Sequence, residues 1–263
     1  MKAKRRKQRR VVHSPDAVRG IREAARATAW VRDQLAASIR PGMTTLEIDQ
    51  LGESLIRQTG GSSAFNGYHG FPGQVCVSID DVIVHGIGSA DAILRPGQLV
   101  SMDVGVKLHG YIGDSALTVR VGGVAAEQVN HLLQTTQNAL EAGIAAARAG
   151  NCVNDISRAV EQAVKPSGYG IVRDFVGHGV GRELHEPPEI PNFTQSARGC
   201  RLVPGMVLAI EPMITLGDPE VVIDSDGWTA RTSDGSVSAH CEHMILITEN
   251  GPEILTWQTT PSE

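Results

Sequence analysis

The stretch LRPGQLVSMD at residues 94–103 recurs as LVPGMVLAIE at residues 202–211, and this repeat decides the fold class. Each copy has a Pro-Gly turn, then apolar residues typical of a strand, and ends on a carboxylate, Asp103 or Glu211. The two copies lie 108 residues apart. Self-similarity of this kind predicts two structurally related halves.

Two further matches support related halves. IRPGMTTLEI at residues 39–48 aligns with residues 147–156 at the same offset of 108, which pairs Gly42 with Gly150. HGIG at residues 85–88 resembles HGVG at residues 178–181. We therefore expect an α+β fold, in which two pseudo-symmetric halves share one sheet that four helices cover on one side.

Local signals predict an α-α-β-β order for each half. Ser14-Pro15 is a helix start, and the apolar spacing continues to Pro41-Gly42; the capping box Thr44–Glu47 then begins a second helix that ends at Gly60. Two hairpin-like strand pairs follow, at residues 75–79 with 82–87 and at residues 98–104 with 111–121. Helices return near residues 125–149 and 153–165.

Composition describes a globular protein with a basic start. The chain has 263 residues, 41% hydrophobic and 20% charged, which excludes disorder, collagen and coiled coil. The first ten residues hold seven of the 24 Lys and Arg and no acid, so the rest of the chain carries a net charge of −12. This pattern predicts a basic tail that contacts a polyanion such as the ribosome, and no sequence-specific nucleic-acid binding by the body.

The remaining composition favours the cytoplasm. The basic start is not followed by the apolar core of a secretory signal, and no apolar stretch approaches the roughly 20 residues of a membrane span. The four cysteines are scattered without a CxxC pair, which is typical of reduced thiols; they are Cys76, Cys152, Cys200 and Cys241. We expect a cytoplasmic protein with no membrane partner.

The repeat also places carboxylates together. A second strand in each half offers another carboxylate, Asp114 or Glu242, and strand alternation turns Asp103 away from its apolar neighbours. Four carboxylates around a pseudo-twofold axis need counter-charge, because each raises the pKa of the others. With His178 they form a set of hard oxygen ligands and one imidazole, which suits two divalent metals and predicts a dinuclear hydrolase.

A known family shares these residues and the motifs around them. The motifs are GYHGFP at 67–72, VCVSIDDVIVHGI at 75–87, SMDVG at 101–105, GDSA at 113–116, GHGVGRELHE at 177–186, AIEPM at 209–213, DGW at 226–228 and CEHMILIT at 241–248. By these motifs and their spacing the chain resembles the type I methionine aminopeptidases of the pita-bread (creatinase/aminopeptidase) fold, in which the shared antiparallel sheet is curved. The resemblance implies one catalytic domain over residues 14–257, between a flexible tail at 1–13 and a C-terminal tail at 258–263.

The resemblance also implies residue roles. Asp114 and Glu242 would bridge two divalent metals, Asp103 would complete one site, and His178 with Glu211 the other. Mn, Fe or Co suits these ligands, and Zn stays open. A water held between the metals would attack the peptide carbonyl. Three residues would be catalytic: Glu211 accepting a proton, His185 stabilising the oxyanion and His85 bonding the scissile amide.

The substrate implied by the resemblance is an N-terminal methionine. Its pocket would be lined by Tyr68, Phe71, Cys76, Leu184 and Trp228, with His85 and His185 facing the substrate. Four positions depart from the usual family residues: Cys241 stands for an aromatic, Met244 for Thr, Leu184 for Phe and Val84 for Cys. These departures bear on rate and side-chain preference.

The expected function is removal of the initiator methionine from nascent proteins when the second residue is small. Two alternatives stay open. One is a non-catalytic peptide-binding module of the same fold, which is opposed by the presence of all five ligand types. The other is an Xaa-Pro peptidase, which is disfavoured by the chain length and by the GYHGFP segment.

Overall fold

The fold begins with two capped helices. In this computed structural model, which describes residues 10–124 and 126–257, α1 spans Pro15–Ser38 and α2 spans Thr45–Gln58. The Ser14 side chain accepts a hydrogen bond from the Ala17 amide, and Thr44 and Glu47 form the reciprocal capping box. Both predicted helices are confirmed, because their starts are encoded locally by side chains that satisfy free amides.

The first-half strands follow α2, but only one predicted pair forms a hairpin. They are β1 (Ser62–Ser63), β2 (Cys76–Ile79), β3 (Val82–Val84), β4 (Leu99–Leu108) and β5 (Tyr111–Arg120), with a 3-10 turn, η1, at Tyr68–Gly70. β4 and β5 pair antiparallel over their full length, as predicted. The prediction that β2 and β3 pair is wrong in the described chain: β2 pairs with β4, whereas β3 pairs with β12 (Ala230–Thr232).

The second half repeats the order of helices and strands. Its elements are α3 (Glu127–Ala146), α4 (Val153–Val164), η2 (Lys165–Ser167), β6 (Gly170–Ile171), β7 (Gly177–Gly179), β8 (Glu186–Ile190), β9 (Val207–Ile210), β10 (Met213–Thr215), β11 (Val221–Ile223), β13 (Ser238–His240), β14 (His243–Thr248) and β15 (Gly251–Ile254). Hydrogen bonding orders the central strands β15-β14-β9-β7-β8, all antiparallel.

Equivalent backbone contacts confirm the internal repeat. The Gly42 amide donates to the Leu94 carbonyl at 2.9 Å, and Gly150 donates to Leu202 at 3.0 Å, 108 residues later. Gly97 and Gly205 of the two Pro-Gly turns have φ angles of 89° and 90°, a left-handed conformation in which a Cβ atom would be strained. The shared turn chemistry therefore produces the same backbone twice.

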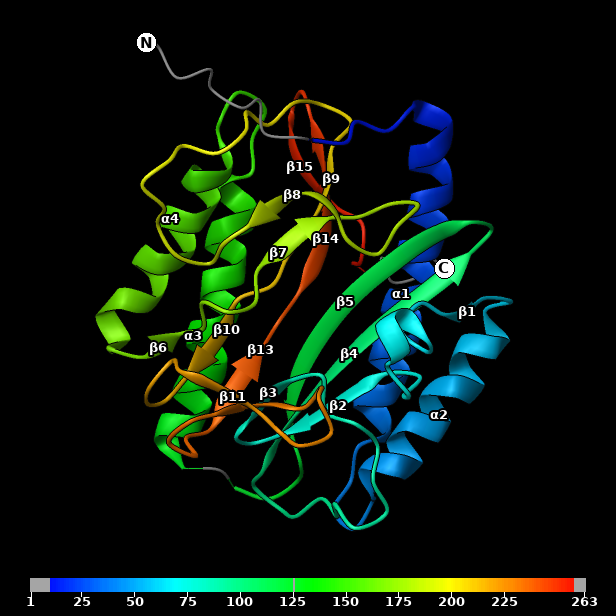
Figure 1. The fold of residues 1–263 in the computed structure, drawn as a ribbon, viewed down its shortest axis with the longest axis vertical. Coiled ribbons are helices and arrows are strands. Elements are labelled where there is room, and N and C mark those ends of the chain that lie inside the picture. Colours follow the sequence, from blue (N-terminus) through cyan, green and yellow to red (C-terminus); the bar gives the residue numbers. More distant parts are fainter. Residues whose placement is uncertain (1–9, 125, 258–263) are drawn as a thin grey trace.

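The two halves join along the strands that carry the carboxylates. The Glu242 amide, just before β14, donates to the Ala116 carbonyl of β5 at 2.9 Å. Helix α1 packs on β4 and β5, and α3 packs on β9 and β13, so that each half has its own helical layer (Figure 1). The curved strands β4 and β5 complete the predicted α+β pita-bread fold.

The described part of the N-terminal segment contacts the second half. Residues 10–13, which belong to the predicted tail, form backbone hydrogen bonds to Pro187 and Gly205. Residues 1–9 and 258–263 of the two predicted tails lie outside the described residues. Within residues 10–124 and 126–257, none of the helices has the length and hydropathy of a membrane span.

Candidate metal centre and substrate pocket

One cavity of about 250 Å³ is lined by all twelve site residues named from the sequence. The twelve are Tyr68, Phe71, Cys76, His85, Asp103, Asp114, His178, Leu184, His185, Glu211, Trp228 and Glu242. They come from both halves of the chain, so the cavity lies where the halves meet.

The strands explain why the carboxylates converge. Asp103 lies on β4 and Asp114 on the neighbouring β5, where Asp103 pairs with Ala116, two residues from Asp114. Alternation turns Asp103 into the cavity, whereas Met102 and Val104 on either side are fully buried in the first-half core, as predicted. Glu211 follows β9 and Glu242 precedes β14, which is paired with β9.

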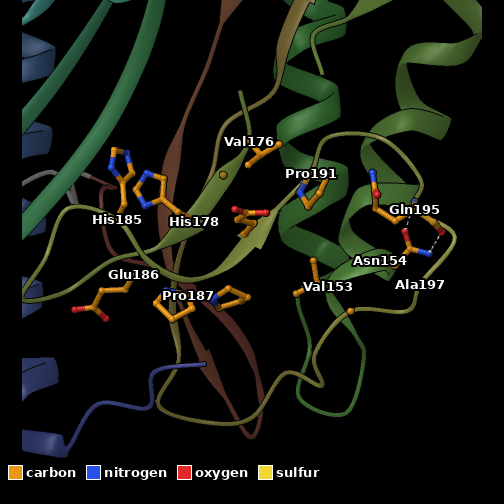
Figure 2. Close-up of a pocket in the computed structure, with 14 residues that line it drawn as sticks. Val153, Asn154, Val176, His178, His185, Glu186, Pro187, Pro191, Gln195 and Ala197 are labelled. Carbon is orange, nitrogen blue, oxygen red and sulfur yellow. Dashed lines mark hydrogen bonds between the residues drawn. The ribbon is translucent and has the colours of Figure 1, made fainter. Parts of the chain in front are cut away.

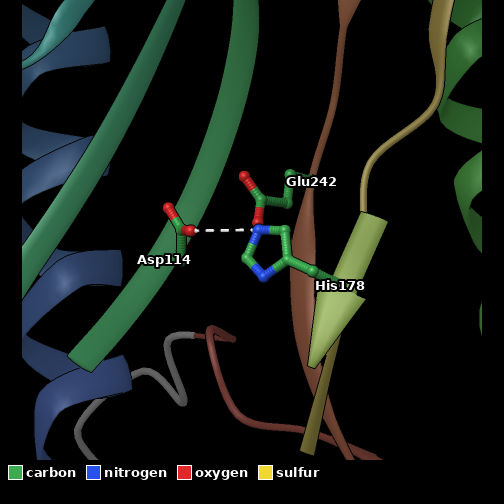
Figure 3. Close-up of side chains that lie close together, drawn as sticks. All are labelled: Asp114, His178 and Glu242. Atoms are coloured by element: carbon green, nitrogen blue, oxygen red, sulfur yellow. Dashed lines mark ion pairs between the residues drawn. The ribbon is translucent and has the colours of Figure 1, made fainter. Parts of the chain in front are cut away.

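The imidazole of His178 faces the carboxylates through one nitrogen. Its Nδ1 donates to the Gly179 carbonyl at 2.9 Å, which makes Nε2 the unprotonated nitrogen of the neutral ring. Nε2 lies 3.4 Å from Glu211 Oε1 and 3.6 Å from Asp114 Oδ2. Ligand atoms of Asp114, His178 and Glu242 all lie within 4.8 Å of one another (Figure 3).

Several oxygens of this cluster lack a hydrogen-bond partner among the described residues. They are Asp103 Oδ1, Asp114 Oδ1 and Glu242 Oε1, all buried. Burial of an unpaired carboxylate costs several kcal/mol, so such oxygens are normally paired or bound to a metal. The donor set of four carboxylates and one neutral imidazole therefore fits a divalent cation.

The pKa values point the same way. Burial, followed by the charges of neighbouring carboxylates, raises the pKa values of Asp114, Glu211 and Glu242 well above the ordinary range. Burial raises the pKa of Asp103 to about 7, and burial with the nearby His185 lowers the pKa of His178 to about 3. A bound cation would reverse the carboxylate shifts, because positive charge favours their ionised form.

Aromatic and imidazole rings form the rest of the cavity. His85, at a strained φ of 59°, lies edge-on to Trp228 with ring centroids 6.1 Å apart, and Trp228 lies 5.2 Å from Phe71. His185 shares a hydrogen bond of 2.7 Å between its Nδ1 and the Tyr68 hydroxyl. These rings therefore form an apolar recess next to the carboxylates.

Three residues in or next to the cavity were not predicted from the sequence. Phe65 and His69 line the cavity, and His240 lies behind Glu211 with Nε2 3.8 Å from Oε2 and 1% of its surface exposed. His240 precedes Glu242 by two residues, so strand alternation could have placed it on the same face. His69 belongs to the GYHGFP segment, whereas Phe65 carries no comparable signal.

Three of the four departures from the family pattern lie outside the cavity. Cys241 is turned away from it, into a separate recess with Arg32 and His243. Val84 packs in a small core cluster. The Met244 sulfur accepts a hydrogen bond from the Asp114 amide at 3.0 Å, so it supports the strand that carries a carboxylate. Leu184 does line the cavity and is 4% exposed.

A larger recess adjoins the site. Its volume is about 700 Å³, and its wall runs from His178 and His185 across β8 to Val153 and Gln195 near α4 (Figure 2). The carboxylates of the cluster do not line it. The smaller cavity is therefore the one that gathers the metal-ligand side chains, and the fold and these side chains together indicate a metal-dependent hydrolase.

Comparison with known proteins identifies the family. Metallopeptidase family M24 matches residues 19–249. The chain is 44% identical to methionine aminopeptidase 1 of Bacillus subtilis over 236 residues, which cover 90% of this chain and 94% of that protein. The crystal structure of methionine aminopeptidase from Thermotoga maritima is 40% identical in sequence and matches with a TM-score of 0.92. The match covers 95% of this chain and 100% of the Thermotoga maritima chain. The chain belongs to the methionine aminopeptidases of metallopeptidase family M24.

The same fold also occurs in peptidases with much lower sequence identity to this chain. An Xaa-Pro dipeptidase from Bacillus anthracis has a TM-score of 0.77 at 22% identity, and the match covers 95% of this chain but 63% of that one. The pita-bread architecture is therefore shared with peptidases of another specificity. The pocket residues, rather than the architecture, must set the specificity.

Proposed function

We propose that this metal-dependent aminopeptidase removes the initiator methionine from nascent polypeptides whose second residue is small. The observation that carries the proposal is the juxtaposition of five ligand-type side chains with an aromatic recess in a single cavity of about 250 Å³. The ligand-type side chains can hold the catalytic cations, and the aromatic recess can hold one unbranched apolar side chain.

Two divalent ions fit the ligand set. Asp114 and Glu242 would bridge them, Asp103 would complete one site, and His178 with Glu211 would complete the other. Mn, Fe or Co suits these oxygen-rich ligands, and Zn also binds such sets. When bound, the ions supply counter-charge for the carboxylates and lower the pKa of a coordinated water toward neutrality.

The chain's own residues position the substrate and move the proton. Glu211 is the candidate proton acceptor, since it lines the cavity beside His178 and would be ionised once bound cations offset the other carboxylates. His185 would donate to the developing oxyanion, while Tyr68 holds its other nitrogen at 2.7 Å. His85, whose pKa is lowered to about 4 by burial and then by His185, would stay neutral and bond the scissile amide.

The recess suits a thioether side chain. Phe71 and Trp228 present ring edges and faces, and sulfur contacts with aromatic rings contribute about 0.3 to 1.5 kcal/mol. Cys76 and Leu184 close the recess and are 3% and 4% exposed. The hydrogen-bonded pair of Tyr68 and His185 lies at the exposed mouth, where a bulky second residue would collide with it.

The charge asymmetry supports a partner and a location. We propose that the basic residues 2–10 help the enzyme meet the ribosome, and that it acts in the cytoplasm, where new chains emerge. Cosedimentation with ribosomes at graded salt tests this proposal. A variant lacking residues 2–9 should bind more weakly with a smaller salt dependence; unchanged binding would contradict it.

The activity test uses two peptides and metal-stripped protein. Free methionine should be released from Met-Ala-Ser after addition of Mn(II), Fe(II) or Co(II), and Ala-Pro-Ser should stay intact. Asp103→Asn/Glu242→Gln should be inactive, whereas Asp16→Asn, at an exposed position, should match the parent. Folded protein that releases no methionine with any metal would indicate the peptide-binding module, and cleavage of Ala-Pro-Ser would indicate an Xaa-Pro peptidase.

A further inference from the structure

A buried contact between a histidine and a carboxylate joins the N-terminal segment to the loop that carries His185. His13 Nε2 lies 3.3 Å from Glu186 Oε2, and the two side chains are 6% and 8% exposed. Ionisable groups are rarely buried to this extent unless they are paired. Neither residue lines the cavity that holds the carboxylates.

Glu186 uses its second oxygen to hold its own loop. Oε1 accepts hydrogen bonds from the Arg182 amide at 2.9 Å and the Glu183 amide at 3.2 Å. Burial by itself would raise the pKa of Glu186, but His13 and these two amides lower it below the ordinary value. The carboxylate is therefore ionised, with Oε1 bound to the loop amides and Oε2 lying 3.3 Å from His13 Nε2.

The N-terminal segment is held independently of this pair. The Val11 amide donates to the Pro187 carbonyl at 3.2 Å, and the His13 amide donates to the Gly205 carbonyl at 2.8 Å. The His13 ring also lies against Gly181, where an added Cβ atom would be only 2.3 Å from it. Residues 10–13, called the N-terminal strap below, thus pack along one side of the loop 181–186.

The other end of the loop faces the substrate recess. Leu184 and His185 line the cavity, and in Figure 2 the side chains of His185 and Glu186 leave the loop in different directions. The Ile112 amide of β5 holds the loop at its start by donating to the Gly181 carbonyl at 2.8 Å. Between Gly181 and Glu186 the loop is therefore anchored on one side by β5 and on the other by His13.

We infer that His13 is a positioning residue for the reaction: through Glu186 the N-terminal strap holds the loop 181–186 so that His185 meets the substrate. This inference rests on the proposed role of His185. A group that acts on developing charge must be held closely, and a shift of about 1 Å costs up to about a hundredfold in rate. The N-terminal strap is thereby part of the active-site scaffold, in addition to connecting the basic tail to α1.

The test compares two substitutions of His13 in the full-length, metal-loaded protein. His13→Phe keeps a ring against Gly181 but loses the nitrogen, and should lower kcat at least about fivefold with less than about a twofold change in KM. His13→Lys places an ammonium donor near Glu186 and should restore most of kcat. His109→Ala is the matched control, because His109 lies 3.5 Å from Glu23 in an exposed pair.

A second measurement does not depend on activity. Hydrogen exchange at the Arg182 and Glu183 amides should accelerate at least about tenfold in His13→Phe and remain at the parent rate in His109→Ala. Parent kcat in His13→Phe, with or without faster exchange, overturns the inference, and so does failure of His13→Lys to restore kcat. If the parent itself releases no methionine, the proposed function fails, while the exchange rates still test the anchoring of the loop.

Discussion

Replacement of Asp103 by Asn should stabilise the metal-free protein at pH 8 and leave its stability nearly unchanged at pH 4. Asp103 is held among three other carboxylates, and burial raises its pKa to about 7. Asn has almost the same shape and carries no charge. The difference in unfolding free energy between the two proteins therefore reports the electrostatic cost of this ligand, including its repulsion of the neighbouring carboxylates.

The magnitude follows from the shift. Asp103 has an ordinary pKa near 3.8 when unfolded and about 7 when folded. Well below pH 3.8 both states are protonated; between pH 3.8 and 7 only the folded state keeps the proton, so the parent loses stability as pH rises. The loss reaches about 4 kcal/mol above pH 7, or roughly 8 to 16 °C in Tm for a domain of this size.

The buried histidines do not obscure this comparison. Burial lowers the pKa values of His178 and His240 to about 3, which makes stability rise with pH over part of the same range. Both histidines are present in the parent and in the Asp103→Asn variant. Their contribution therefore cancels in the difference, although it would mask the slope of either protein alone.

The assay is thermal unfolding in chelator from pH 4 to 8.5, with Asp16→Asn as the control for an exposed carboxylate. Saturating Mn(II) should remove most of this difference, since a ligand at a thousand times its Kd stabilises by about 4.1 kcal/mol and the parent keeps the full ligand set. A Tm difference between parent and Asp103→Asn that does not change from pH 4 to 8 would refute the reasoning.

Three further outcomes follow from the site. Trp228→Ala should raise KM for Met-Ala-Ser about tenfold or more, because it removes one wall of the recess; steady-state kinetics measures this, and an unchanged KM counts against the pocket. Met244→Leu leaves the buried Asp114 amide without its acceptor, so it should lower the free energy of unfolding by about 1 to 3 kcal/mol and weaken metal binding. Met102→Leu, in the core, is the control and should not weaken metal binding. Equal metal affinities of the two variants would contradict this prediction. The Cys241 thiol, with a pKa raised to about 11 by burial, should resist iodoacetamide at pH 8 until the protein is unfolded, as mass spectrometry would show; rapid labelling of the folded protein would disprove its burial.

The features that could be read from the sequence are those encoded within a few residues or repeated along the chain. The Ser14 cap and the Thr44–Glu47 capping box define helix starts through contacts within three residues. The Pro-Gly turns at Gly97 and Gly205 impose the same left-handed backbone in both halves. The ligand-type residues were found for the same reason, since strand alternation and the repeat relate their positions.

Partners far apart in the chain could not be predicted in this way. β3 of the first half pairs with β12 of the second half across about 150 residues, whereas β2 pairs with β4 within the first half. Phe65 reaches the cavity from a segment with no recognised motif, and its ring lies against Gly105 of β4. Such contacts depend on how the halves pack, and no local pattern encodes that arrangement.

The two halves, their helix starts and the residue types of the ligand set could be predicted from the chain alone, because each depends on local backbone chemistry or on the internal repeat. Which side chains surround those ligands depends on the packing of distant segments. Two examples are the contact of His240 with Glu211 and the contact of His13 with Glu186. Each brings together buried side chains, and the strength of each interaction depends on that burial. Burial is a property of the packed chain, since it depends on which distant residues exclude water from each group.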